Sequence, residues 1–143
     1  MSIDNIKICV ANWGNNKEAL KQIRRQVFIE EQNVPEDMEW DEHDESSTHF
    51  LITLDDKAIA TARLKSDGQI GRMAVVQEYR NLGIGSKLLQ FVLQYATSQN
   101  VKQVYLHAQV EAIPFYEKHG FTTHSEIFYE ANIPHRDMLK KIC

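Results

Sequence analysis

Apolar and polar positions follow two different periods in the first third of the chain. From residue 6 to residue 13 apolar side chains alternate with polar or small ones, which predicts a half-buried strand. The Gly-Asn-Asn run at residues 14–16 predicts a break after it. From residue 17 to residue 31 apolar side chains recur at helical spacing, and this predicts an amphipathic helix. Because proline disfavours helical geometry in the residue before it, Asn33-Val34-Pro35 should end that helix.

The middle of the chain alternates strand-like runs with tight turns. Residues 49–54 and 57–64 predict two strands joined by Asp55-Asp56. Ser66-Asp67-Gly68 is a second turn signal, and residues 69–76 predict the strand after it. Three consecutive strands with such short connections should form an antiparallel meander.

The second half of the chain adds helices and a crossover. Residues 83–99 predict a helix, and the strand predicted over 101–108 should lie parallel to strand 69–76 because a helix connects them. A short helix over 111–119 should stop at Gly120, and two final strands are expected around 121–130 and 135–142. We expect the turn Asn132-Ile133-Pro134 to separate these two strands.

These elements predict one domain over residues 1–143, of the α/β class with a mixed sheet and not a doubly wound one. A chain of this length can bury about two-thirds of its unfolded surface. Its 43% hydrophobic and 25% charged residues are ordinary for a globular protein.

Charge is distributed unevenly along the chain. Lys and Arg are absent between residues 26 and 56, where eleven of the twenty Asp and Glu residues lie. Removing those charges from the net charge of −4 leaves +7 on the rest of the chain, which suits a polyanionic ligand there. The acidic stretch is explained equally well as a solvated loop or as a functional one. A basic stripe interleaved with aromatic residues is missing, so we expect no nucleic-acid partner.

The termini and cysteines suggest the compartment. The sequence has no apolar run of bilayer-spanning length and no basic-then-apolar signal pattern at its start, so we expect no membrane segment. Cys9 and Cys143 lie at opposite ends of the chain without metal-site spacing. Two reduced thiols in a cytoplasmic protein are the simplest interpretation.

Two metal hypotheses can be rejected from the sequence. Asp37, Glu39 and Asp41 alternate as in a calcium loop, but Glu42 stands where glycine is needed and Thr48 where a bidentate glutamate is needed. The histidines of this stretch lack partners at zinc-like spacing. We therefore expect no metal.

The most informative motif is the glycine-rich run from Arg80 to Gly85, R-x-x-G-x-G, between a predicted strand and a predicted helix. Gly83 and Gly85 let the backbone come close to a ligand. The free N–H groups and the dipole of the following helix make an anion site, most naturally for phosphate. Arg80 adds a positive charge.

Two other glycine motifs do not fit this run. The dinucleotide fingerprint needs a third glycine, where the chain has Leu88. The P-loop needs Gly-Lys-Ser/Thr, whereas Gly85 is followed by Ser86-Lys87 in the reverse order.

A second motif, downstream in the sequence, narrows the interpretation of the glycine-rich run. Ala112, Tyr116, Gly120 and Phe121 form the pattern A-x-x-x-Y-x-x-x-G-F. In this order and at this spacing, the two motifs resemble those of the GNAT superfamily of acyl-CoA-dependent N-acetyltransferases, over roughly residues 48–141. The resemblance implies mostly antiparallel strands with one parallel, splayed pair and flanking helices.

The resemblance also implies acetyl-CoA as co-substrate, lying between the splayed strands. The pantetheine arm should contact the backbone of Met73, Ala74 and Val75. The pyrophosphate should lie on the loop and the helix start, at Arg80, Asn81, Leu82, Gly83, Ile84, Gly85 and Ser86. Gln109 and Phe115 complete the expected cofactor site, although many family members have asparagine where this chain has Gln109.

Catalytic roles follow from the same resemblance. Tyr116 matches the family position whose hydroxyl lies near the thioester sulfur, and is our candidate general acid. The loop from Glu130 to His135 resembles that of the glyphosate N-acetyltransferases, in which the histidine acts as base; an ordinary turn histidine is an equal alternative here. Glu130 is the second candidate base, and we assign His107 and His119 to the structure.

The acceptor is expected to be a small-molecule amine, contacted by Arg24, Phe28 and Glu130. The acidic stretch favours a cationic amine, whereas Arg24 and Arg25 favour one that carries a carboxylate, so its class stays open. A non-catalytic acyl-CoA-binding module and a protein-modifying acetyltransferase are the alternatives. The sequence leaves the oligomeric state open, a homodimer included.

Overall fold

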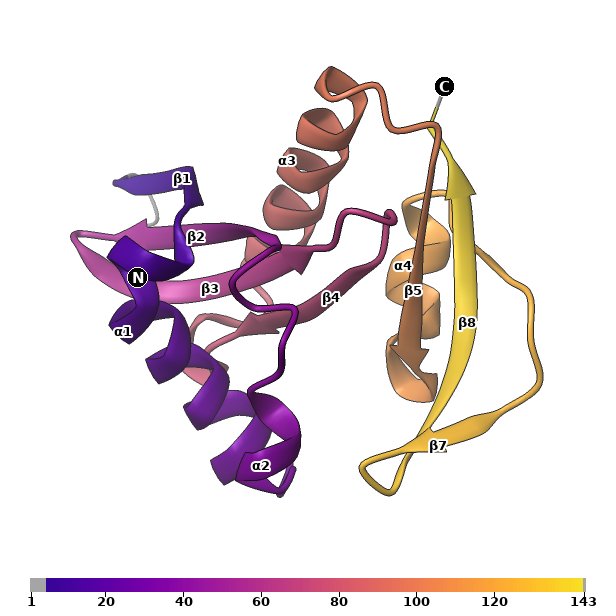
Figure 1. Ribbon diagram of the computed structural model, residues 1–143, viewed down its shortest axis with the longest axis horizontal. Helices are drawn as coiled ribbons and strands as arrows, with labels where there is room; N and C mark the ends of the chain where they lie inside the picture. The colour runs from indigo at the N-terminus through magenta and orange to yellow at the C-terminus, as the bar shows by residue number, and fades with distance from the viewer. Residues whose placement is uncertain (1–4, 143) are drawn as a thin grey trace.

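The computed structural model describes residues 5–142 and consists of two antiparallel sheets that diverge from a single contact (Figure 1). The first sheet has the order β1-β2-β3-β4, formed by β1 (Ile6–Ala11), β2 (Thr48–Leu54), β3 (Lys57–Leu64) and β4 (Ile70–Val75). In the second sheet β8 (Ile133–Lys141) pairs with β5 (Gln103–Gln109), β6 (Thr122–Thr123) and β7 (Phe128–Glu130). The predicted meander is confirmed as β2-β3-β4.

The two sheets meet at one parallel bridge, between Gln69 and Tyr105. The backbone N–H of Tyr105 donates to the carbonyl oxygen of Gly68 at 3.1 Å. Beyond this bridge β4 and β5 share no ladder, so the expectation of one parallel, splayed pair is confirmed. The edge of β4 that faces β5 therefore keeps backbone groups without a strand partner.

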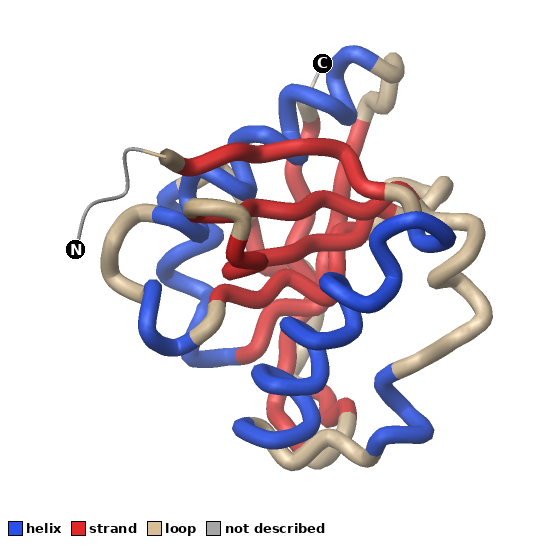
Figure 2. The backbone as a smooth tube through the Cα atoms, turned by 90° about the vertical axis from the view of Figure 1, so that its left-hand side faces the viewer, coloured by secondary structure: helices blue, strands red, loops and turns tan. Residues whose placement is uncertain are grey.

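Helices cover both faces of the first sheet. On one face Phe50 of β2 packs edge-on against Phe91 and Tyr95 of α3 (Ile84–Ser98). His49, whose side chain points to the opposite face, stacks on Trp13 of α1 (Trp13–Arg24). Because both faces are covered, most residues of β2 and β3 are buried. Figure 2 shows the strands with helices on either side.

The first helix begins four residues earlier than the sequence predicts. The side chain of Asn12 accepts hydrogen bonds from the backbone N–H groups of Gly14 at 2.7 Å and Asn15 at 3.1 Å, so it caps a helix that starts at Trp13. The Gly-Asn-Asn run is thus the first turn of the helix and not a break. From Arg25 the helix continues as a π-helix, η1 (Arg25–Glu31), to the predicted end.

The remaining helices are short, apart from α3. Glu36–Glu39 forms α2, and the 3-10 turns η2 (Gln77–Tyr79) and η3 (Val110–Ala112) precede α3 and α4 (Ile113–Lys118). The predicted helix over 111–119 is therefore η3 followed by α4. None of the helices within residues 5–142 has the length and apolar character needed to cross a bilayer.

The C-terminal hairpin turns more tightly than predicted. Ala131 and Asn132 both have positive φ, at 49° and 64°, and connect β7 directly to β8. Ile133 and Pro134 are already part of β8, where Pro134 lies opposite Tyr129. The strand predicted over 121–130 is two short strands, β6 and β7.

Part of the acidic stretch balances the charge of buried arginines. Glu39, Asp41 and Asp44 form ion pairs with three arginines, Arg24, Arg63 and Arg72, at distances between 2.7 and 3.2 Å. The guanidinium and carboxylate of the Arg24–Glu39 pair are almost completely buried. A solvated loop is therefore the wrong interpretation for these three residues, although Glu42 and Glu45 of the same stretch are exposed.

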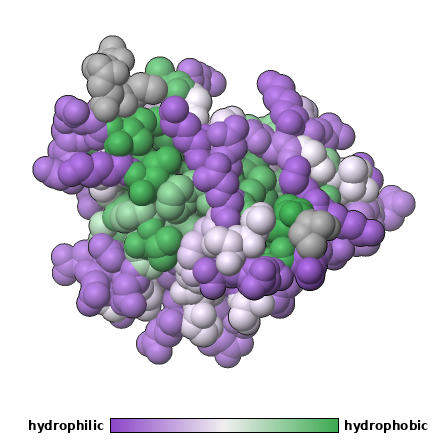
Figure 3. Space-filling model, turned by 90° about the horizontal axis from the view of Figure 1, so that it is seen from above, coloured by the Kyte–Doolittle hydropathy of each residue, from purple (hydrophilic) through white to green (hydrophobic). Residues whose placement is uncertain are grey.

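Figure 3 shows the face seen from above, where hydrophobic residues gather between hydrophilic margins. Among the described residues Cys9 of β1 is a free, exposed cysteine. Cys143, the other cysteine, lies outside the described residues.

Candidate active site

A cavity of about 1120 Å³ occupies the opening between β4 and β5. Its walls come from η1, α2, β4, the loop after β4, the start of α3, β5, α4 and the β7–β8 hairpin. A smaller hollow of about 630 Å³, between α3 and the end of β8, contains none of the predicted site residues.

The large cavity gathers most of the predicted site residues. The predicted cofactor contacts that line it are Met73, Ala74, Val75, Arg80, Asn81, Gly83, Ile84, Gly85, Ser86, Gln109 and Phe115. The candidate acid Tyr116, both candidate bases (His135 and Glu130) and the candidate acceptor contact Phe28 also line it. Leu82 does not, and its side chain faces solvent.

The start of α3 presents bare amides to the cavity. Gly83 has φ +81° and is the N-cap, and no side chain caps the helix. The first helical hydrogen bond runs from the N–H of Lys87 to the carbonyl of Gly83 at 3.1 Å. The N–H groups of Ile84, Gly85 and Ser86 therefore have no helical acceptor and are free for an anion.

Gly85 leaves space where any other residue would fill it. A Cβ atom at this position would lie 3.5 Å from Cζ of Phe115 and 3.9 Å from Cγ2 of Val75, both cavity-lining residues. Those are ordinary contact distances, so a small side chain fits the fold but occupies the cavity wall. The glycine keeps the backbone open to a ligand.

Arg80 has a second role that the sequence does not indicate. Its guanidinium forms a bidentate ion pair with Glu31 at the end of η1, with both N–O distances 2.7 Å. Its Nε donates to the carbonyl of Val75 at 2.9 Å. The hydrogen bonds that Arg80 donates to Glu31 raise the pKa of Arg80 and lower the pKa of Glu31. Arg80 thus joins the end of β4 to the wall that carries Phe28.

Lys118 of α4 is a cavity-lining cation that sequence reasoning missed. It forms no ion pair with any residue in the range 5–142. The next residue, His119, places its Nε2 3.1 Å from Oγ of Ser86 at the phosphate loop. The positive charge of Lys118 is therefore available on this side of the cavity.

A bulge bends β4 where it borders the cavity. Between the pairs Thr61–Ala74 and Arg63–Gly71, two residues of β4 face one of β3, and Arg72 within this bulge has φ +48°. Met73, Ala74 and Val75 follow directly and line the cavity.

Tyr116 keeps its proton at neutral pH. Its hydroxyl donates to Sδ of Met73 at 3.9 Å, across the cavity between α4 and β4. Burial raises the pKa of Tyr116 to about 12. A hydroxyl in this state can give a proton but is not a base under ordinary conditions.

His135 is held in one orientation. Its Nδ1 lies 2.7 Å from the carbonyl oxygen of Ile133, and its ring stacks on Phe128 with an interplanar angle of 19°. The carbonyl can only accept, so Nδ1 carries the proton and Nε2 of the neutral ring has the free lone pair.

Glu130 is a poorer candidate base than His135. Its Oε1 lies 2.6 Å from Nδ1 of His107, and this hydrogen bond lowers the pKa of Glu130 and raises that of His107. Nε2 of His107 lies 3.2 Å from Oδ1 of Asp137. Sequence reasoning assigned His107 to the structure alone, because its partners lie on β7 and β8 and only the strand register brings them together.

The structure does not bring Arg24 to the cavity. Its side chain is fully buried, and its guanidinium bonds to Glu39 and Asp44 at 2.7 Å and to the carbonyl of Glu39 at 2.8 Å. The expectation that Arg24 contacts the acceptor therefore has no support in the geometry. Arg72 reaches the cavity instead, with its charge already paired to Glu39 and Asp41.

Gln109 spans the opening at the C-terminal end of η1. Its Nε2 donates to Oε1 of Gln32 at 2.9 Å, and both residues line the cavity. The longer amide at this position is thus used within the protein. A contact from Gln109 to a cofactor stays a prediction.

Comparisons with known proteins identify the family. The family model described as the acetyltransferase (GNAT) domain matches residues 14–142. The chain is 34% identical over 132 residues to the uncharacterized N-acetyltransferase YjcF of Bacillus subtilis, which covers 87% of this chain and 94% of that protein. It is 36% identical over 132 residues to the protein ElaA of Escherichia coli, covering 87% and 86% of the two chains.

Comparison with solved structures agrees with the sequence comparison. The crystal structure of Escherichia coli ElaA has a TM-score of 0.85 at 30% identity, and an acyl-CoA N-acyltransferase of Pseudomonas aeruginosa has 0.86 at 28% identity. Each alignment covers 94% of this chain and 99% of the other. These matches confirm the resemblance drawn from the two motifs and the predicted fold class. The chain belongs to the GNAT acetyltransferase family.

Proposed function

We infer that the protein, as a member of this family, is an acyl-CoA-dependent acyltransferase. We propose that it transfers an acetyl group from acetyl-CoA to the amine of a small molecule, by direct attack in a ternary complex. The observation that supports this most is one cavity that holds bare helix amides, a protonated tyrosine and a histidine with a free Nε2.

The residues present suit coenzyme A. The amides of Ile84, Gly85 and Ser86 would hold the pyrophosphate, with Lys118 supplying charge. The unpaired edge of β4 at Met73, Ala74 and Val75 would accept the pantetheine amides as an added strand. When bound, acetyl-CoA supplies a thioester whose acyl carbon an amine can attack.

The chain's own residues then accept one proton, donate another and stabilise the negative charge that develops on the acyl oxygen. Nε2 of His135 accepts the proton that the acceptor nitrogen loses as the new C–N bond forms. A backbone N–H of Ala74 or Val75 stabilises the negative charge on the acyl oxygen. The Tyr116 hydroxyl gives its proton to the sulfur as the C–S bond breaks.

We also propose that the protein works in the cytoplasm. The exposed, free thiol of Cys9 fits a reducing compartment, where such thiols persist.

Two alternatives use the same cavity. A non-catalytic acyl-CoA sensor needs neither an oriented histidine nor a tyrosine held in its protonated state. A protein-modifying enzyme needs an extended groove for a peptide, whereas this cavity lies between β4 and β5 and is bordered by η1 and the β7–β8 hairpin.

Thiol release from acetyl-CoA, measured with a panel of small amines, tests the proposal. We expect turnover on at least one small amine, with kcat reduced in Tyr116→Phe and His135→Ala. Tight CoA binding by calorimetry with no turnover on any amine would support the sensor. Acetylation of proteins alone, in a lysate treated with the purified enzyme, would support the protein-modifying alternative.

A further inference from the structure

The charged side chains that line the cavity are not balanced evenly between its two ends. Arg80 is paired with Glu31, and Arg72 is paired with Glu39 and Asp41. Lys118, at the phosphate end, has no ion pair within the described range. Arg72, the arginine at the other end, thus offers no free positive charge to a carboxylate on the acceptor.

That other end carries an excess of negative charge. The two ring nitrogens of His107 each face a carboxylate oxygen, Oε1 of Glu130 at 2.6 Å and Oδ1 of Asp137 at 3.2 Å. A neutral imidazole has one N–H and would turn a lone pair toward the second carboxylate, so the two carboxylates favour the doubly protonated ring, and the hydrogen bond with Glu130 raises the pKa of His107. One imidazolium then faces two carboxylates, which leaves one negative charge uncompensated.

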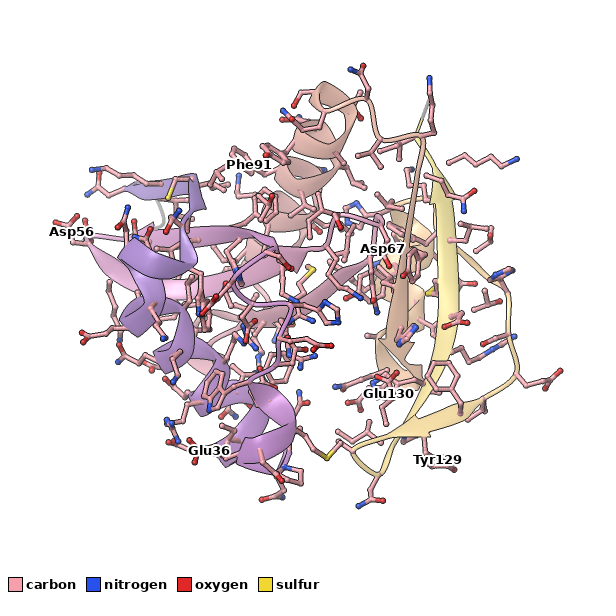
Figure 4. The ribbon with its side chains drawn as sticks, viewed as in Figure 1. Glu36, Asp56, Asp67, Phe91, Tyr129 and Glu130 are labelled. Carbon is pink, nitrogen blue, oxygen red and sulfur yellow. The ribbon has the colours of Figure 1, made fainter. Side chains whose placement is uncertain are left out.

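The excess charge is accessible at Glu130. Oδ1 of Asp137 is buried and makes no hydrogen bond to the described residues, and the ion pair of this carboxylate is with His107. The Glu130 side chain is 47% exposed, and its second oxygen, Oε2, has no hydrogen-bond donor among the described residues. Figure 4 shows Glu130 on the side of β7 that faces β5, with Tyr129 on the opposite side.

Strand register places this carboxylate one pleat away from the candidate base. His107 lies opposite Asp137, and Gln109, two residues further along β5, lies opposite His135. Two residues along a strand span about 6.8 Å, and directly opposite residues point to the same face. On β7, Phe128 lies opposite His135 and Glu130 follows two residues later, so the backbone of Glu130 is also roughly 7 Å along the sheet from that of His135, and its side chain reaches His107.

The wall opposite this face is apolar. Val27 and Phe28 of η1, Val34 and Met38 line the cavity there, and Ile133 borders it from β8. This surface suits an alkyl or aryl segment, and Gln32, a polar residue that lines the cavity between Phe28 and Val34, is already bonded to Gln109.

From this arrangement we propose that the acceptor is a diamine: one nitrogen reacts beside His135, the other binds Glu130 as an ammonium, and an apolar spacer of about 7 Å separates them. His107 acts as a positioning residue that holds the Glu130 carboxylate. This inference rests on the proposed function, because it assigns the acceptor class of the same cavity.

Three amines of matched length test the proposal: diaminopentane, pentylamine and aminopentanoate. We expect wild-type kcat/KM for diaminopentane to exceed that for pentylamine at least about ten-fold, since a charge-assisted hydrogen bond separates them. Aminopentanoate, which places a carboxylate beside Glu130, should be the poorest acceptor. Glu130→Gln should reduce the preference for diaminopentane to about two-fold, whereas Glu126→Gln, on an exposed residue outside the cavity, should keep it.

Equal kcat/KM for diaminopentane and pentylamine would overturn the proposal, as would a preference that survives in Glu130→Gln. Should no amine be turned over, the proposed function fails, but calorimetry on the protein–CoA complex still decides the recognition. Diaminopentane that binds wild type and Glu126→Gln but not Glu130→Gln supports the diamine site. If pentylamine binds the wild-type complex as tightly as diaminopentane does, the diamine site is refuted.

Discussion

Nδ1 of His135 lies 2.7 Å from the carbonyl oxygen of Ile133, two residues earlier in the same strand. This short contact fixes the tautomer, because a carbonyl oxygen accepts and cannot donate. Nε2 is then the nitrogen that can accept a proton from an amine. The extended backbone of β8 and the ring of Phe128 hold the imidazole in this orientation.

Replacing His135 should remove the acidic limb of the pH–rate profile. A base works only when unprotonated, so wild-type kcat/KM should rise as pH rises through the range in which an imidazole loses its proton. His135→Ala should lower kcat/KM by about 10²-fold and flatten that rise. Steady-state thiol release between pH 5 and 9 measures both effects. His124→Ala, an exposed histidine outside the cavity, serves as control, and a variant profile that still rises would return the role to Glu130 or to water.

Tyr116→Phe should lower kcat far more than it weakens CoA binding. The hydroxyl is needed only when the sulfur leaves, and a general acid contributes about 10²-fold or more. Because burial raises the pKa of Tyr116 to about 12, this acid stays protonated and should cause no fall in wild-type activity up to pH 10. Stopped-flow thiol release and calorimetry separate rate from affinity. Tyr95→Phe on α3 is the control, and an unchanged kcat in Tyr116→Phe would remove Tyr116 from the mechanism.

Substitution of the two loop glycines should have different effects: on CoA affinity at Gly85 and on stability at Gly83. Gly85→Val places a side chain against Phe115 at the cavity wall, so CoA binding should weaken at least ten-fold in calorimetry while the melting temperature changes little. Gly83→Ala meets no neighbour within 4 Å but forces an L-residue to φ +81°, which costs about 1–2 kcal/mol of stability. Equal CoA affinity in Gly85→Val and wild type would contradict the anion site at α3.

Sequence reasoning succeeded where the signal is local. The R-x-x-G-x-G run predicts bare amides because glycine placement and the helix start are adjacent in the chain, and the meander follows from short turns between strands. Prediction from the sequence failed where the interacting residues are distant in the chain. The pairing of Arg24 with Glu39 and Asp44, and that of His107 with Glu130 and Asp137, depend on tertiary contacts that no spacing encodes.

The helix start at Trp13 was missed for a different reason. Asn12 and the residues after it are typical of turns, and the same polar side chains also cap helices. Only the geometry, in which the Asn12 side chain accepts two backbone N–H groups, distinguishes the two. The π-helical turns of η1 likewise carry no sequence signature, although they place Phe28 and Glu31 at the cavity and at Arg80.

Two adjacent arginines should differ sharply in their effect on stability. Arg24→Ala leaves the buried Glu39 and Asp44 carboxylates without this partner, which should cost about 3–5 kcal/mol of unfolding free energy. Arg25 pairs with Glu36 on the exposed surface, so Arg25→Ala should change stability little. Urea unfolding at pH 7 measures both, and Arg24→Lys tests whether a point charge can replace the planar fork.

The cost of losing Arg24 should also depend on pH. Burial alone would raise the pKa of Asp44, but its hydrogen bond and charge interaction with Arg24 outweigh this and lower it. A carboxyl whose pKa is lowered on folding contributes stability above its unfolded pKa of about 4 and loses it as pH falls through the folded value. The stability gap between wild type and Arg24→Ala should therefore be full at pH 7 and shrink below about pH 4. A gap that stays constant from pH 7 to pH 3 would show that packing, and not the ion pair, accounts for the loss.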